Sequence, residues 1–316
     1  MKIVVLDRSC LTADYLDWSR LNELGEVSIY DKTPRDKVVE RIRDAQIVLT
    51  NNALMNEEVF SKCPELKYIG VFSTGYNHIN LEDAKKYGIT VCNAPSYGTK
   101  IVAQNAIALL LEVTNRVAKF NSDVRNGHWI ESSFACAESD PIIELDNKTA
   151  GIIGFGRIGR QSARILSAIG MNIIYYDVFD AETEYESQKV EFNELLEKSD
   201  VIFLHCPLNE ENREIINKET ISRMKDGVIL VNNARGGLIN DNDLAEALKN
   251  GKIRAAALDV VSKEPISKDN PLLECDNCII TPHISWSSNE ARIRMIETAI
   301  DNVKNFIEGH PVNTVN

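Results

Sequence analysis

The sequence predicts an α/β protein in which strands and helices alternate in two successive series, each series forming a parallel sheet. The chain has 316 residues, and at roughly 150 residues per domain this length favours about two domains. Short β-rich runs alternate with helix-compatible stretches over residues 1–98. The pattern begins again at Thr149 and continues to about Pro282.

The first series contains five short runs with the composition of buried strands. They are Lys2 to Leu6, Val27 to Tyr30, Gln46 to Leu49, Tyr68 to Phe72 and Thr90 to Cys92. Polar stretches with apolar residues at helical spacing lie between them, as in Pro34 to Arg43 and Leu81 to Tyr87. This alternation predicts parallel strands with helices on both faces of the sheet.

A long helix is expected after the first series. The apolar residues that share one helical face are Ala106, Leu109, Leu110, Val113 and Val117. Residues 121–147 show no clear periodicity and are expected to form an irregular arm. The last helix, from about Asn289 to Glu308, also has one apolar face. Because it follows the second series, the chain is expected to return to the first domain there.

A glycine-rich turn opens the second series. From Thr149 an apolar strand runs into Gly154-Phe155-Gly156-Arg157-Ile158-Gly159, which has the G-x-G-x-x-G pattern of a dinucleotide-binding turn. An amphipathic helix follows. The next strand ends at Asp177, close to the ~20-residue offset expected for an acid that binds a ribose. The glycine pattern alone is weak, but these features occur together and in the expected order.

Each part of this motif has a physical role in holding a dinucleotide. Gly154 permits the tight turn, Gly156 lets the backbone approach a pyrophosphate, and Gly159 allows close packing of helix and strand. The free N–H groups and dipole at the helix start attract the phosphate charge. Asp177 would accept hydrogen bonds from the adenosine ribose and repel a 2′-phosphate, which favours NAD over NADP.

Four polar residues follow strands of the second series. They are His205, Arg235, Asp259 and His283. Ligands of open α/β sheets bind at the carboxyl ends of the strands, so all four are candidates. Arg235 could clamp a carboxylate or form a surface ion pair. A strand-end histidine is more often structural than catalytic, and spacing does not choose between His205 and His283. Glu264 lies in a loop five residues after Asp259, where glutamates are common.

The composition indicates which binding partners and which cellular compartment to expect for this protein. The chain has 35 basic and 47 acidic residues and a formal net charge of −12, which argues against nucleic acid. No apolar run reaches the ~18 residues needed to span a membrane, and the first residues are too short an apolar run for a signal peptide. Seven cysteines, an odd number, predict reduced thiols in a cytoplasm. Cys275 and Cys278 lack the second pair that a zinc site needs, so no metal is expected.

In this order the motifs resemble those of the D-isomer-specific 2-hydroxyacid dehydrogenases along essentially the whole chain. The matching segments are Ala94 to Thr99, Gly127 to Trp129, Gly151 to Gly159, His205 to Leu208, Asn232 to Gly237, Leu258 to Val260, Glu264-Pro265 and Thr281 to His283. The resemblance implies two Rossmann-like or flavodoxin-like parallel-sheet lobes, doubly wound, with an active-site cleft between them. Residues 1–98 plus 285–316 would form the substrate lobe and residues 99–284 the NAD-binding lobe. It also implies a homodimer that pairs through the NAD-binding lobes, with the arm contributing.

The resemblance also implies roles for individual residues. Arg235 matches the arginine that holds the substrate's carboxylate and keto oxygen, His283 the proton donor and acceptor, and Glu264 the carboxylate that orients and charges it. Backbone N–H groups of Thr74 and Gly75 would bind the substrate carboxylate. The residues expected at the cofactor are Thr99, Gly154, Gly156, Arg157, Ile158, Gly159, Asp177, His205, Cys206, Pro207, Ala234 and Asp259.

The position after the His283 motif points to a substrate. Trp286 stands where the family often has small residues, and an aromatic here is similar to the hydroxypyruvate and glycerate branch. The implied activity is reversible reduction by NADH of hydroxypyruvate or glyoxylate to D-glycerate or glycolate. The alternatives are phosphoglycerate or D-lactate dehydrogenase activity, and a role as an NAD-sensing corepressor or scaffold. The extra regulatory domain found on many phosphoglycerate dehydrogenases is absent, which argues against a phosphorylated substrate.

Overall fold

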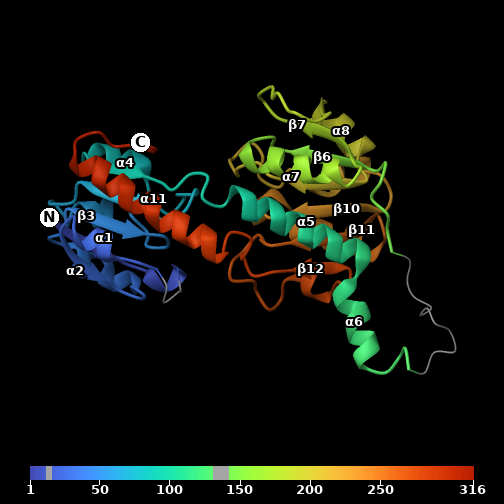
Figure 1. Ribbon diagram of the computed structural model, residues 1–316, viewed down its shortest axis with the longest axis horizontal. Coiled ribbons are helices and arrows are strands. Elements are labelled where there is room, and N and C mark those ends of the chain that lie inside the picture. Colours follow the sequence, from blue (N-terminus) through green and yellow to red (C-terminus); the bar gives the residue numbers. More distant parts are fainter. Residues whose placement is uncertain (12–15, 131–141) are drawn as a thin grey trace. The chain divides into compact units, whose positions relative to one another are not determined.

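The computed structural model describes residues 1–11, 16–130 and 142–316 (Figure 1). The chain divides into two compact units. Unit 1 comprises Met1–Gly98 and Trp286–Asn316, and unit 2 comprises Thr99–Ser285. The final helix therefore belongs to unit 1. Part of the expected arm, residues 131–141 with Cys136, lies outside the described residues, and a cleft between two lobes stays a prediction.

Unit 1 contains a five-stranded sheet with the order β2-β1-β3-β4-β5, and every pair is parallel. Its strands are β1 (Lys2–Val5), β2 (Glu26–Ile29), β3 (Ile47–Thr50), β4 (Tyr68–Val71) and β5 (Thr90–Cys92). Its helices are η1 (Arg8–Leu11), α1 (Ser19–Asn22), η2 (Arg35–Lys37), α2 (Val38–Ile42), α3 (Glu57–Phe60), α4 (Leu81–Lys86) and α11 (Asn289–Ile307). Each strand ends within one residue of its predicted position, and the order is that of a flavodoxin-like sheet.

Both faces of this sheet are covered, as a parallel sheet requires. Ile3 and Val5 face a core that includes Met295 of α11, whereas Val4 faces a second core that includes Ile42 of α2. All five side chains are fully buried. Alternate residues of one strand therefore anchor helices from distant parts of the sequence on opposite faces.

Unit 2 contains a seven-stranded parallel sheet with the order β12-β11-β10-β9-β6-β7-β8. Its strands are β6 (Thr149–Ile153), β7 (Asn172–Tyr176), β8 (Gln188–Lys189), β9 (Val201–Leu204), β10 (Val228–Asn232), β11 (Ile253–Leu258) and β12 (Cys278–Ile280). Its helices are α5 (Thr99–Asn115), α6 (Val117–Arg125), α7 (Arg157–Ala168), α8 (Phe192–Lys198), α9 (Lys218–Arg223), η3 (Gly236–Leu238), α10 (Asp241–Lys249) and η4 (Pro271–Glu274). The strand order reverses between β6 and β9, which is the point where such sheets bind ligands.

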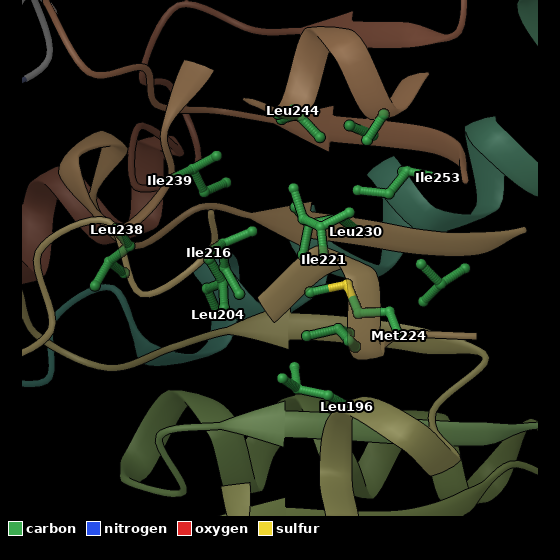
Figure 2. Close-up of a cluster of buried hydrophobic side chains, with 14 of the residues drawn as sticks. Leu196, Leu204, Ile216, Ile221, Met224, Leu230, Leu238, Ile239, Leu244 and Ile253 are labelled. Atoms are coloured by element: carbon green, nitrogen blue, oxygen red, sulfur yellow. The ribbon is translucent and has the colours of Figure 1, made fainter. Parts of the chain in front are cut away.

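Two cores cover the faces of the second sheet. Phe203 of β9 packs in the core that also contains residues of α5 and α7, while its neighbour Leu204 packs in the core beneath α8, α9 and α10. Figure 2 shows the second core, where Leu204 and Leu230 lie among aliphatic side chains and Met224. This core covers one face of β9 to β12, and the parallel pairing of these four neighbouring strands aligns their carboxyl ends.

The predicted long helix is broken, which corrects the sequence analysis. Arg116 adopts the left-handed conformation with φ of +52°, and the chain resumes as α6 in a new direction. Val117, predicted on the buried stripe, is 64% exposed because the break turns it away from the core. Helix α6 also continues to Arg125, so the first residues of the expected irregular arm are helical.

Two further features concern cysteines and membranes. The cysteines with described side chains are free thiols, namely Cys63, Cys92, Cys206, Cys275 and Cys278. Among residues 1–11, 16–130 and 142–316, no helix has the length and apolar character needed to cross a bilayer.

Candidate active site

Four neighbouring strands of unit 2 place polar residues at one edge of the sheet. His205 follows β9, Arg235 follows β10, Asp259 follows β11 and His283 follows β12. The parallel pairing of these strands puts their carboxyl ends together. The arrangement is the one that the strand-end positions predict.

A histidine–carboxylate pair lies at this edge. Nδ1 of His283 is 2.7 Å from Oε2 of Glu264, and Oε1 of Glu264 accepts a hydrogen bond from the backbone N–H of Val261. When Nδ1–H donates to Glu264, the other ring nitrogen, Nε2, is left to meet a substrate. His283 has a φ of +54°, an uncommon conformation for a residue with a side chain, often found at functional sites.

The pair changes the acidity of both partners. The hydrogen bond to Glu264 raises the pKa of His283 above its ordinary value, with the charges of Glu264 and Asp259 acting in the same direction, while burial and Arg235 oppose them. Burial acts to raise the pKa of Glu264, but the hydrogen bond and charge of His283 outweigh it and leave that pKa lowered. The geometry therefore favours the imidazolium–carboxylate form.

Asp259 supports the turn that carries His283. Its carboxylate is 1% exposed and accepts hydrogen bonds from the Thr281 hydroxyl at 2.5 Å, the Ile284 N–H at 2.9 Å and the Ser285 N–H at 2.8 Å. Its backbone carbonyl accepts from the N–H of His283. The resemblance assigned Asp259 to the nicotinamide end of the cofactor. The structure adds a structural role, since the buried carboxylate holds residues on both sides of His283.

Arg235 is presented by a turn that the sequence analysis overlooked. The fully buried Asn232 donates from Nδ2 to the carbonyl of Arg235 and accepts at Oδ1 from the N–H of Ala234. The sequence signal for this turn is the asparagine at the end of an apolar strand, Asn232, whose amide can hydrogen-bond to the backbone that follows. In the part of the chain that the structure describes, no carboxylate lies within ion-pair distance of Arg235, and Nη1 donates to the Ala234 carbonyl. The guanidinium can therefore accept an external anion.

His205 has different surroundings from His283. Nε2 of its ring is 3.0 Å from the Ser162 hydroxyl on α7, and the ring stacks near Phe203 with centroids 5.9 Å apart. Burial lowers the pKa of His205 to about 4, so the ring is neutral at physiological pH. Of the two histidines that spacing left open, His283 alone has a carboxylate on its ring.

The glycine turn has the close packing and the open space that a dinucleotide requires. A Cβ added to Gly154, where φ is +92°, would lie 2.5 Å from the backbone N of Cys206, and one added to Gly159 would lie 2.2 Å from the carbonyl oxygen of Gly154. A Cβ on Gly156 would meet nothing within 4 Å. Gly156 caps α7 without a side chain, so the helix N-terminus is open to a pyrophosphate.

The other residues expected at the cofactor surround this turn. Asp177 follows β7, and its carboxylate accepts from the N–H groups of Phe155 at 2.6 Å and Phe179 at 3.1 Å. Arg157 and Ile158 begin α7, and Thr99 begins α5. Cys206 and Pro207 follow β9, with Asn212 Nδ2 donating to the Pro207 carbonyl. Burial raises the pKa of the Cys206 thiol to about 11, so it is no nucleophile.

Two expected substrate segments lie in unit 1. The carbonyls of Thr74 and Gly75 accept from the side chains of Asn93 at 2.8 Å and Ser73 at 2.5 Å. Among the described residues, the N–H groups of Thr74 and Gly75 have no acceptor, so they can bind an anion. Trp286 meets Tyr97 edge to face, with centroids 6.4 Å apart.

Comparison with known proteins agrees with this arrangement. A family model described as "D-isomer specific 2-hydroxyacid dehydrogenase, NAD binding domain" matches residues 107–285. A hydroxypyruvate reductase of Blautia hydrogenotrophica is 51% identical over 321 residues, covering 100% of both chains. A glycerate dehydrogenase of Methylorubrum extorquens is 35% identical, covering 99% of this chain and 98% of its own. The D-lactate dehydrogenase from Aquifex aeolicus, solved with NAD and lactic acid, superposes with a TM-score of 0.85 at 32% identity, covering 98% and 96% of the two chains.

The open space at Gly156 gives a direct test of cofactor binding. Gly156→Ala should fold with an unchanged melting temperature, because its φ of −71° suits alanine and the methyl group meets no atom. It should weaken NADH binding by roughly tenfold or more, because the methyl group occupies the space of the pyrophosphate. Fluorescence titration with NADH measures the affinity. Unchanged affinity would contradict this placement.

The histidine–carboxylate pair gives a second test. Glu264→Gln should lower the pKa of His283, because the neutral amide forms a weaker hydrogen bond to Nδ1 and lacks the carboxylate charge that favours the imidazolium. NMR titration of the imidazole signals measures this pKa. The same titration of the native protein is the reference. An unmoved His283 would show that Glu264 does not charge it.

Proposed function

The chain belongs to the D-isomer-specific 2-hydroxyacid dehydrogenase family, and we propose that it reduces hydroxypyruvate or glyoxylate to D-glycerate or glycolate. It is an NAD-dependent oxidoreductase of small 2-hydroxy acids. The observation that carries the proposed chemistry is the hydrogen bond of 2.7 Å between His283 and Glu264. The pair lies on the same sheet edge as Arg235, which has no carboxylate partner among the described residues. Such a set can bind a 2-keto acid and protonate its oxygen.

Substrate binding is proposed to depend on two kinds of donor. The guanidinium of Arg235 presents a planar fork that suits a carboxylate and a neighbouring keto oxygen. The N–H groups of Thr74 and Gly75 are proposed to bind the same carboxylate, because their own carbonyls are already held by side chains. Together these donors would neutralise the substrate's charge and orient its keto group.

Proton transfer is proposed to occur at Nε2 of His283. The reducing equivalent is the hydride that NADH supplies when it is bound. As the keto carbon is reduced, its oxygen gains negative charge, and the imidazolium of His283 donates a proton to that oxygen. Glu264 holds the ring through Nδ1 and stabilises the charged form before the transfer. In the oxidative direction, neutral His283 takes the proton back.

Cofactor selectivity is proposed to follow from charge around Asp177. Its carboxylate lies at the end of β7, beside the glycine turn, where it would bind a ribose hydroxyl and repel a 2′-phosphate. Lys189 is the nearest downstream cation in the sequence, and it is paired with Asp180 at 2.7 Å. NAD is therefore the proposed coenzyme in preference to NADP.

The substrate assignment is supported by relatives and by one aromatic side chain. The hydroxypyruvate reductase that is 51% identical and the glycerate dehydrogenase that is 35% identical carry this activity in their names. In unit 1, Trp286 is held by Tyr97 and by the guanidinium of Arg292, which lies 5.5 Å from the centre of its ring. We propose that this fixed indole limits the substrate to a small side chain.

A panel of 2-keto acids tests the activity. Oxidation of NADH should be fastest with hydroxypyruvate or glyoxylate, slower with pyruvate and 3-phosphohydroxypyruvate, and slower with NADPH than with NADH. His283→Gln should lower turnover by about 10²–10⁴-fold while leaving the affinity for NADH nearly intact. Full turnover in this variant would contradict the proton-transfer role. Tight NADH binding without turnover on any acid would favour a sensor or scaffold.

We also propose that the protein forms a homodimer that pairs through unit 2, and that it is located in the cytoplasm. In and after α6, the apolar side chains of Val117, Val124, Trp129 and Ile130 are 64%, 43%, 50% and 86% exposed. Exposed apolar residues gathered on one segment are typical of an interface. The free thiols of the described cysteines support a reducing compartment.

Light scattering after size-exclusion chromatography tests the dimer. The native protein should have roughly twice the chain mass of 35.4 kDa. Ile130→Asp should shift the mass toward the monomer, because it places a charge in the proposed interface. Leu273→Asp is the matched control, since Leu273 is also exposed, at 53%, but lies on η4. A native monomer would contradict the proposal.

A further inference from the structure

The loop that carries Glu264 is exposed around that residue. It runs from Val261, shortly after the end of β11, to Asn270, just before η4, and both of these end residues are buried. Ser262, Lys263 and Glu264 between them are exposed. The side chain that charges His283 therefore depends on how the two ends of its loop are held.

One carboxylate oxygen contacts both ends of this loop. Oδ2 of Asp241 accepts a hydrogen bond from the Ser262 hydroxyl at 2.6 Å and another from Nδ2 of Asn270 at 2.7 Å. Ser262 lies 21 residues from Asp241 in sequence and Asn270 lies 29 residues from it. Because a single oxygen receives both bonds, it fixes the distance between the two ends of the loop.

Asp241 is well suited to this position. It is the first residue of α10 and is 9% exposed, so the positive end of the helix dipole stabilises its charge. The two side-chain hydrogen bonds offset part of the cost of burying a carboxylate. Burial raises the pKa of the Cys278 thiol to about 12, and the charge of Asp241 acts in the same direction, so this thiol stays neutral.

The loop is also pressed against the segment that carries Arg235. A Cβ on Gly236 would lie 1.8 Å from the carbonyl oxygen of Val261 and 2.6 Å from the backbone N of Ser262. The start of the loop therefore lies directly on the residue after Arg235. Asp241 accepts the hydrogen bond of the Ser262 hydroxyl and so holds the same start of the loop. Val261, the residue before Ser262, donates its N–H to Oε1 of Glu264.

We propose that Asp241 is a positioning residue for catalysis, which holds the Glu264 loop so that Glu264 reaches the ring of His283. The proposal rests on the proposed function of the His283–Glu264 pair. Asp241 touches neither partner, and it acts through Ser262, Val261 and Asn270. Loss of its carboxylate should let the loop move and lengthen the hydrogen bond between Glu264 and His283.

The expected effect has a definite sign. The charged groups that act on His283 are Glu264 and Asp259, which raise its pKa, and Arg235, which lowers it. If Glu264 moves away, the balance shifts and the pKa of His283 falls. Reduction needs protonated His283, so the alkaline limb of kcat/KM for reduction should move to lower pH. Oxidation needs the neutral ring, so its acid limb should move in the same direction.

The test compares four variants of the full chain by pH profile, NADH affinity and melting temperature. Asp241→Ala and Ser262→Ala should move the alkaline limb for hydroxypyruvate reduction down by about 0.5–1 pH unit, with NADH affinity within about twofold of the native value. Alanine is used at position 241 because the amide oxygen of asparagine could still accept both hydrogen bonds. Glu264→Gln is the reference for loss of the charge of the pair. Asp243→Ala is the matched control on the same helix, because the carboxylate of Asp243 accepts from the Lys218 N–H instead of from the loop, and it should not move the limb.

The outcomes separate this inference from the proposed function. If Glu264→Gln moves the limb and both Asp241→Ala and Ser262→Ala leave it in place, Asp241 is structural only and the proposal is overturned. A lower melting temperature does not change that reading, because stability alone does not move the pH limb. If Glu264→Gln leaves the limb in place, the proposed role of the pair fails and this inference fails with it. A shift in all three, with none in Asp243→Ala, supports the proposal.

Discussion

The buried carboxylate of Asp259 is the constraint on which the arrangement around His283 depends. A charge that is 1% exposed is costly unless it is hydrogen-bonded, and Asp259 obtains three bonds from residues 281–285 alone. Those bonds hold His283 at a positive φ that an unsupported turn would avoid. The hydrogen bonds to the Asp259 carboxylate therefore offset the backbone strain at His283. They fix the orientation of the imidazole ring before a ligand binds.

A second carboxylate, Asp241, acts on the other half of the pair. It ties the two ends of the Glu264 loop, while Asp259 ties the turn of His283. The two anchors start from different elements, α10 and β11, and both elements are fixed by the core shown in Figure 2. The proposed proton-transfer pair thus joins two separately anchored segments, which explains how exposed side chains can keep a hydrogen bond of 2.7 Å.

Local positive charge explains how a protein with a net charge of −12 can take anionic ligands. The guanidinium of Arg235 has no carboxylate partner among the described residues, and the first turn of α7 begins at Gly156 without a side-chain cap. Both lie at carboxyl ends of strands in one sheet. A diffuse negative surface acts weakly at this range because salt screens it within ~10 Å, whereas a short contact to Arg235 or to a helix N-terminus is strong.

The sequence by itself determined the two parallel sheets, the strand ends and the glycine turn, because these depend on periodicity and on residue types near one another in the chain. It placed every strand of unit 1 within a residue and brought His205, Arg235, Asp259 and His283 to one edge. Only the tertiary structure decided the break at Arg116, the pairing of His205 with Ser162 across 43 residues, and the link from Asp241 to both ends of a loop. The contacts of Ser162 and Asp241 join residues far apart in the chain, and no local pattern identifies the partners. The break at Arg116 is a left-handed backbone conformation that its residue type does not predict.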